Sequence, residues 1–149
     1  MSMGLRFDFD EVLDANRRFA ILQKLVPSIE LADAVGAEVE DQVRARIGDE
    51  KESPDGQPWE PWSAAYAKTR QSNHSLLQNE GDLLDDITYE AFTDHVLVGS
   101  NLVYFGVMNF GNEAQNIPAR PVLGFSDENV NDLQDVVSVF LNQQIGALT

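Results

Sequence analysis

The sequence predicts an α+β fold in which a small antiparallel sheet packs with N-terminal helices and a C-terminal amphipathic helix. Three observations favour this class. Apolar residues recur at helical spacing near both ends of the chain. Segments of β-rich composition lie between residues 87 and 100. Helices and strands do not alternate regularly, which argues against a parallel doubly wound sheet.

The first expected helix covers about residues 9–25. Asp8, followed three positions later by Glu11, has the form of a capping box at its start. Its apolar positions alternate by three and four and so share one face; they are Val12, Ala15, Phe19, Leu22 and Val26. Pro27 interrupts this helix.

A second helix is expected to begin at Ser28, whose hydroxyl can cap it, and to stop at Gly48. Its apolar stripe comprises Ile29, Ala32, Gly36, Val39, Val43 and Ile47. Charged residues lie largely off that stripe, namely Glu38, Glu40, Asp41, Arg44 and Arg46. This helix should therefore bury one face and expose the other.

The next segment, residues 49–57, is rich in Asp, Glu, Ser, Pro and Gly, and we expect an exposed, mobile loop. Pro61 is expected in the first turn of a short helix that carries Ala64, Ala65, Tyr66 and Lys68. Residues 70–75 form a further polar break.

The clearest hairpin pairs residues 87–92 with residues 95–100 around a turn at Thr93 and Asp94, after a short helical turn that Asp82 caps. Residues 102–109 are apolar enough to be buried, and we favour a helix there. Ser126 or Asp127 caps the last helix, with its stripe Val130, Leu133, Val137, Phe140, Leu141 and Ile145, and with Asn131, Asp132, Asp135 and Asn142 facing water.

Length and composition favour one domain over residues 1–149, because 43% hydrophobic residues can supply a core of that size. No apolar run approaches the roughly 20 residues that cross a bilayer, and the start lacks the layout of a secretory signal. We therefore expect a soluble, unexported chain. The absence of cysteine excludes disulfides, thiolate metal clusters and cysteine nucleophiles.

The charge balance is strongly acidic, with 25 Asp and Glu against 10 Lys and Arg and a formal net charge of −15. Proteins that grip duplex DNA usually show the reverse. An acidic surface instead suits a conduit past which DNA slides, or simply provides solubility.

Catalytic patterns are scarce. The two histidines, His74 and His95, lie in no zinc-protease or nucleophile-elbow motif, and neither phosphate-binding glycine pattern is present. Adjacent carboxylates do occur, at Asp85-Asp86 and Asp127-Glu128, but the second pair is explained by favourable charge at a helix start. We expect no enzyme activity, no metal and no cofactor.

Three residues have two readings each. Trp59 and Trp62, set among prolines, either anchor an irregular loop to the core or reach a neighbouring subunit. Arg120, between Pro118 and Pro121, is either an internal ion-pair partner or an intersubunit one.

A series of turn and aromatic signals runs through residues 54–124. It comprises Pro54, Gly56, Pro58 and Trp59; Leu77, Gly81 and Leu83; Val98-Gly99-Ser100; Tyr104 with Phe110-Gly111; and Ile117-Pro118-Ala119-Arg120-Pro121-Val122-Leu123-Gly124. In this order and spacing the signals resemble the phage virion morphogenesis family, which includes Mu-like morphogenesis proteins and the tail completion proteins of temperate contractile-tailed phages. The chain departs from that family at Met108, where relatives usually have histidine, and at Val122, where they have an aromatic residue.

The resemblance implies a structural phage protein that completes or terminates the tail and joins it to the head. It implies a homo-oligomeric ring, expected to be a hexamer, at the neck of the virion. The ring would contact the head connector on one side and tail tube or sheath proteins on the other, with DNA passing unbound through the lumen. Assembly would take place in the host cytoplasm, without a membrane. The expected interface residues are Trp59, Trp62, Tyr104, Phe110 and Arg120.

A second hypothesis is an acidic inhibitor or DNA mimic that blocks a nucleic-acid-binding enzyme through its carboxylates. It explains the charge equally well, but it leaves the Pro-Trp and Pro-Ala-Arg-Pro patterns unexplained. A carboxylate-dependent hydrolase ranks third.

Overall fold

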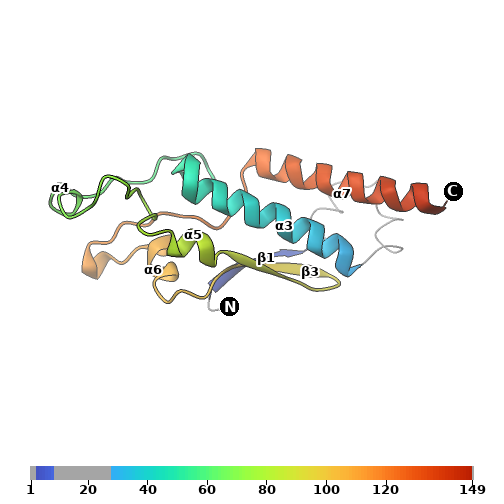
Figure 1. Ribbon diagram of the computed structural model, residues 1–149, viewed down its shortest axis with the longest axis horizontal. Coiled ribbons are helices and arrows are strands. Elements are labelled where there is room, and N and C mark those ends of the chain that lie inside the picture. Colours follow the sequence, from blue (N-terminus) through green and yellow to red (C-terminus); the bar gives the residue numbers. More distant parts are fainter. Residues whose placement is uncertain (1–2, 9–27, 149) are drawn as a thin grey trace.

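The computed structural model describes residues 3–8 and 28–148 and shows an α+β architecture, as the sequence predicts. A three-stranded antiparallel sheet lies on one side of the long helix α3, and the C-terminal helix α7 runs alongside α3 (Figure 1). The helix expected over residues 9–25, with Glu11 and Pro27 at its ends, lies outside the described residues.

The sheet has the order β1-β3-β2, with β1 at Met3–Asp8, β2 at Thr88–Ala91 and β3 at His95–Ser100. The predicted hairpin of β2 and β3 is confirmed, and its turn is closed by a bond from Phe92 N to His95 O of 2.9 Å. Strand β1 is missing from the sequence prediction. It pairs antiparallel with β3 so that Leu5 faces Val98 and Phe7 faces Val96.

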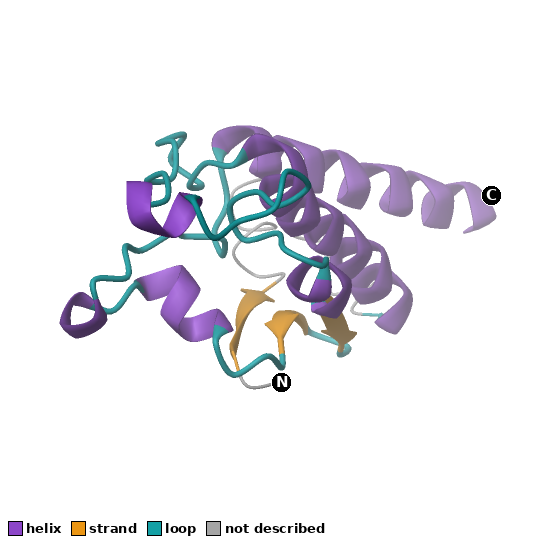
Figure 2. Ribbon diagram, turned by 60° about the vertical axis from the view of Figure 1, so that its left-hand side comes forward, coloured by secondary structure: helices purple, strands orange, loops and turns teal. Residues whose placement is uncertain are grey.

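Helix α3, Ile29–Ala45, begins as predicted, because Leu31 N donates to Ser28 Oγ at 3.2 Å. The predicted stripe is buried except for Ile29, which is exposed. Gly36 lets α3 approach the sheet closely, since a Cβ there would lie 2.3 Å from the ring of Tyr89. The described part of the core therefore forms between α3, the sheet and α7 (Figure 2).

The expected stop at Gly48 is wrong. The chain continues as a π-helical turn, η2 at Arg46–Glu50, and ends at Lys51, which takes a left-handed conformation with φ of 56°. Lys51 N donates to Arg46 O at 3.0 Å, which closes the wider turn. The Lys51 ammonium also donates to Leu76 O at 2.9 Å, so a side chain beyond Gly48 fixes where the helix ends.

Helix α7, Asp127–Leu148, has a reciprocal cap at its start: Asn129 N donates to Ser126 Oγ, and Ser126 N donates to Asn129 Oδ1, both at 3.1 Å. This confirms Ser126 as the cap. Leu133, Val137 and Leu141 are buried, whereas Val130 is partly exposed. The predicted water-facing side chains of Asn131, Asp132, Asp135 and Asn142 are all exposed.

Four short helical segments complete the described chain: α4 at Ala64–Ala67, α5 at Asp82–Asp86, α6 at Phe105–Phe110 and the 3-10 turn η3 at Glu113–Gln115. The helix expected near residues 102–109 is confirmed as α6. Pro61 lies before α4 and not in its first turn as expected, because the helix begins after Ser63, whose hydroxyl caps it by accepting from Tyr66 N at 3.2 Å. Gly81, not Asp82, holds the cap position of α5, because its φ of 96° suits glycine.

The segment expected to be a loose loop over residues 49–57 is instead a hydrogen-bonded turn. Ser53 N donates to Gln57 O and Gly56 N donates to Ser53 O, both at 2.8 Å. Asp55 Oδ1 accepts from Gln57 N at 3.2 Å; residues 49, 50 and 55–57 are exposed, and residues 51–54 are partly buried. Within the described residues, no helix combines the length and apolar character needed to span a membrane.

Candidate interaction surfaces

Two segments project from the end of the molecule opposite the C-terminus (Figure 1). One is residues 60–80, which carry α4 and are called here the α4 arm. The other is residues 111–119, which carry η3 and are called the η3 arm. A β-bridge between Asn112 and Ile117 closes the η3 arm. Gly111 begins it with a φ of 75°, where a Cβ would lie 2.6 Å from Ala119 N.

Trp59 lies in the core at the base of both arms. Its side chain is only 5% exposed, and its indole Nε1 donates to Pro121 O at 2.9 Å. Its backbone N donates to Lys51 O at 3.0 Å, which fixes the preceding turn. The structure thus places Trp59 as an anchor within its own subunit.

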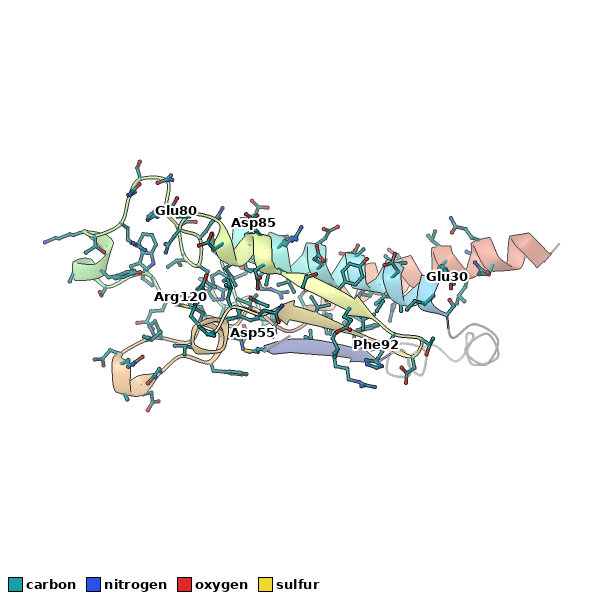
Figure 3. All side chains as sticks on the ribbon, turned by 60° about the horizontal axis from the view of Figure 1, so that its bottom comes forward. Glu30, Asp55, Glu80, Asp85, Phe92 and Arg120 are labelled. Atoms are coloured by element: carbon teal, nitrogen blue, oxygen red, sulfur yellow. The ribbon has the colours of Figure 1, made fainter. Side chains whose placement is uncertain are left out.

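Arg120 joins the two arms where they leave the core (Figure 3). Its side chain is buried; Nε donates to Glu60 O at 2.9 Å and Nη2 to Pro61 O at 3.3 Å. Burial lowers the pKa of Arg120, and the nearby Glu60 carboxylate opposes that shift. Among the described residues, its hydrogen-bond acceptors are backbone carbonyls and not the carboxylate that an ion pair would require.

The α4 arm carries a small exposed aromatic cluster. The rings of Trp62 and Tyr66 meet edge to face, with centroids 6.0 Å apart and planes at 75°. The Arg70 guanidinium lies 4.9 Å from the centre of the Tyr66 ring and donates to Asn79 Oδ1 at 2.8 Å. Trp62 is half-buried and Tyr66 is exposed, so the cluster presents aromatic surface to solvent.

The most exposed large hydrophobic side chains that the structure describes lie just before α6 and at its last residue. Val103 is 92% exposed and Phe110 is 74% exposed, with Tyr104 beside Val103; these three residues are called the α6 patch. Burial raises the pKa of Tyr104, and the carboxylates of Asp82 and Asp86 raise it further. Exposed large apolar side chains on one short helix and in the turn before it suit a protein contact.

The α6 patch is held in place from behind by a buried side chain. Asn109 is buried and its Oδ1 accepts from Val122 N at 2.8 Å and from Leu123 N at 3.1 Å. Phe105 is fully buried beside it. The helix that displays Phe110 is therefore fixed to the core, which suits a preformed surface.

The predicted candidates thus divide into two groups. Trp59 and Arg120 lie inside the subunit, whereas Trp62, Tyr104 and Phe110 present surface to solvent. Tyr66 and Val103 are also exposed, but the sequence did not predict them as interface residues. Val103 lies within the apolar run 102–105, where nothing in the sequence separates the exposed position from the buried one at Phe105.

In the carboxylate pairs considered for chemistry, Asp86 has hydrogen-bond partners within the fold. Asp86 Oδ2 accepts from Ser100 Oγ at 2.5 Å and from Asn101 N at 2.8 Å, and the hydrogen bond from Ser100 is the main reason that the pKa of Asp86 is lowered. Asp127 and Glu128 lie in the first turn of α7. Within the described part of the chain, His, Cys, Asp and Glu form no group suited to a metal ion.

Comparisons place the sequence among phage proteins. The sequence profile of the phage virion morphogenesis family matches residues 12–142. A protein of Escherichia phage Mu named "Putative capsid assembly protein G" is 28% identical over 92 residues, which cover 55% of this chain and 59% of that protein. The match therefore spans less than two thirds of the relative's length. No solved structure gave a significant match.

Proposed function

Because the chain belongs to the phage virion morphogenesis family, we propose that it completes the tail and joins it to the head as a ring of six copies around the DNA channel. A role in phage particle assembly follows from the family. The ring, its neck position and its copy number are the proposal. The protein acts by contact in this account and performs no bond-making chemistry.

Two exposed apolar surfaces from different segments of the chain support the ring proposal. A heterologous ring needs two different complementary surfaces on each subunit. The α6 patch and the Trp62–Tyr66 cluster of the α4 arm come from different segments, and both expose aromatic side chains. Aromatic residues are enriched at the centres of protein interfaces, so each surface suits one side of a subunit contact.

The base of the arms supports the same proposal. Trp59 and Arg120 fix both arms to the core through bonds to Pro121 O, Glu60 O and Pro61 O. Rigid presentation of contact residues lowers the entropy lost on assembly. The partners expected above and below such a ring are the head connector and the tail tube or sheath proteins.

The acidic surface suits a lumen through which DNA moves. A formal net charge of −15 repels the phosphate backbone, so DNA passes without a binding site. In this account the protein resides in the virion neck and assembles with its partners in the host cytoplasm.

The experiment is a phage lysate made without this chain. We expect filled heads and finished tails to accumulate unjoined, and purified protein added to the mixed lysate to restore joined, plaque-forming particles. Tails of uncontrolled length would instead indicate that the chain terminates tube growth. Normal particles in its absence would overturn the proposal.

The runner-up function is an acidic inhibitor or DNA mimic, which the net charge favours. It predicts a monomer that inhibits a nucleic-acid-binding enzyme at stoichiometric concentration. A sizing experiment near physiological salt together with a nuclease inhibition assay separates it from the neck function.

A further inference from the structure

We propose that an acidic groove between α3, the turn at residues 52–56 and the start of α7 binds a basic segment of another protein. The groove has a volume of about 1120 Å³. Eight carboxylates line it: Glu38, Asp41, Glu50, Glu52, Asp55, Asp127, Glu128 and Asp132. This inference does not depend on a ring or on a neck position.

The basic side chain at the floor of the groove, Arg46, already makes hydrogen bonds within the protein. Arg46 is the only basic residue among those that line the groove, and its side chain is 1% exposed. Its guanidinium donates to Val122 O at 2.6 Å, to Gly124 O at 3.1 Å and to Asn129 Oδ1 at 2.6 Å. Arg46 therefore builds the floor rather than neutralising the wall.

The carboxylates of the wall have little compensation. Among the ion pairs that the structure describes, only Glu50 of these eight has a cationic partner, with its Oε2 3.9 Å from Arg46 Nε. Carboxylates gathered on one wall with so few cations repel one another. A cationic ligand would relieve that repulsion and gain charge-assisted hydrogen bonds.

A buried amide supplies a second, independent indication of a ligand. Gln42 is 7% exposed and lines the groove. Its Nε2 donates to Glu38 Oε1 at 3.0 Å and to Asn129 O at 3.1 Å, whereas its Oε1 has no hydrogen-bond partner. A buried acceptor without a donor is unusual in native proteins. A ligand that carries N–H donors as well as positive charge therefore suits this groove.

The distribution of the carboxylates favours a peptide over a metal ion. They come from three segments along an open groove, and the described residues form no group that could hold a metal. Arginine suits such a wall, because its planar guanidinium donates to a carboxylate in a bidentate arrangement. Several Arg or Lys side chains on an extended segment would match the spread of charge.

The occupant is assigned to another protein because a second copy of this chain would bring excess negative charge to an acidic groove. Each copy has a formal net charge of −15. Several of its own cations are engaged internally: Arg44 with Glu40 at 3.0 Å, Arg70 with Asn79 and Arg120 with Glu60 O. The net negative charge of this chain attracts a basic partner from a distance, before the two proteins come into contact.

Two aspartates one helical turn apart provide a matched test. Asp132 and Asp135 are both exposed on α7, but only Asp132 lines the groove. The variants Asp132→Lys and Asp135→Lys change the net charge equally. The probe is a fluorescein-labelled peptide of alternating arginine and glycine with four arginines, and its dissociation constant is measured by fluorescence anisotropy with the full chain.

We expect Asp132→Lys to weaken peptide binding roughly tenfold or more, and Asp135→Lys to change it less than about twofold. Equal weakening by the two variants, or no binding to the unmodified chain, would overturn the proposal. A second pair of variants tests the same prediction in case a lysine variant fails to fold. Each variant of this pair replaces four carboxylates by isosteric amides. The groove set is Asp41→Asn, Glu52→Gln, Asp55→Asn and Asp132→Asn; the control set is Glu30→Gln, Glu90→Gln, Glu113→Gln and Asp135→Asn.

Carbodiimide cross-linking of assembled particles identifies the occupant. A cross-link from Glu52 or Asp55 to a lysine in a basic segment of another protein supports the proposal. A cross-link from these residues to Lys68 of a second copy would make the groove a self-contact and overturn it. The proposal is also overturned if carboxylates elsewhere on the chain form cross-links to neighbouring proteins and those of the groove form none.

Discussion

The indole of Trp59 donates to the carbonyl oxygen of Pro121 at 2.9 Å, and the guanidinium of the adjacent Arg120 donates back to Glu60 O, next to Trp59. The Pro-Trp and Ala-Arg-Pro patterns, about 60 positions apart in the sequence, therefore form one reciprocal clamp. These are two of the patterns on which the family resemblance rests. Their shared role in this structure is to hold the bases of the two arms.

The clamp predicts an asymmetry between the two tryptophans. Trp59→Phe removes the donor to Pro121 O inside the core, and we expect it to lower the free energy of unfolding by about 1–3 kcal/mol. Trp62→Phe is the control, because Trp62 is half-buried at the surface, and its cost should be below about 1 kcal/mol. Urea unfolding monitored by circular dichroism measures both, and equal costs would refute the clamp.

Gly36 and Gly48 predict opposite effects of one methyl group. A Cβ at Gly36 would lie 2.3 Å from the ring of Tyr89, so Gly36→Ala should cost about 1–3 kcal/mol through overpacking. A Cβ at Gly48 would have nothing within 4 Å, so Gly48→Ala should stabilise by about 0.5–1 kcal/mol. The measurement is the midpoint of thermal unfolding. A tolerated alanine at position 36 would contradict the close contact between α3 and β2.

Tyr89 predicts a stability change at high pH. Its hydroxyl donates to Asp33 Oδ1 at 2.6 Å, and this bond, followed by burial, raises the pKa of Tyr89 from 10.0 to about 12. Because the pKa is higher in the folded state, this contribution to stability is complete below pH 10 and is lost as the pH rises through 12. Absorbance at 295 nm should show a phase near pH 12 that Tyr89→Phe removes. Asp33→Asn should lower the pH of that phase, and an unchanged titration would exclude the contact.

A substitution in the α6 patch should impair particle assembly without lowering the stability of the fold. Phe110 is 74% exposed, so Phe110→Ser should change the free energy of unfolding by less than about 0.5 kcal/mol while reducing the recovery of joined particles. Val139 on α7 is 57% exposed and serves as the control, since Val139→Ser removes apolar surface away from both arms. Complementation of a phage that lacks the chain is the assay. Full complementation by the Phe110 variant would remove the patch from the interface.

The helices and the hairpin could be predicted because their patterns are local. Helical spacing of apolar residues located α3 and α7, and β-rich composition around Thr93 and Asp94 located β2 and β3. Strand β1 could not be found in this way, because its partner β3 lies far along the chain and six residues carry little periodicity. The end of this helical segment cannot be read from local pattern, because Lys51 fixes it through hydrogen bonds to residues 75 and 76.

The candidate surfaces were only half predictable. Sequence alone treats Trp59 and Phe110 alike, as large aromatic residues near turns, yet one is 5% exposed and the other 74%. Burial depends on which segment covers a residue, and local pattern does not record that. Arg46 shows the same limit: in the sequence it belongs to the charged residues largely off the apolar stripe of α3, yet it is buried and donates to the carbonyls of residues 122 and 124.

The position of the chain in purified particles, and its copy number there, decide whether it forms a ring at the neck. Cryo-electron microscopy of intact virions, with the chain identified by a small C-terminal tag, measures both. We expect one closed ring of six copies at the junction of head and tail, with the α6 patch of each subunit against its neighbour. Copies distributed through the capsid shell, or particles that are joined and infectious without the chain, would contradict it.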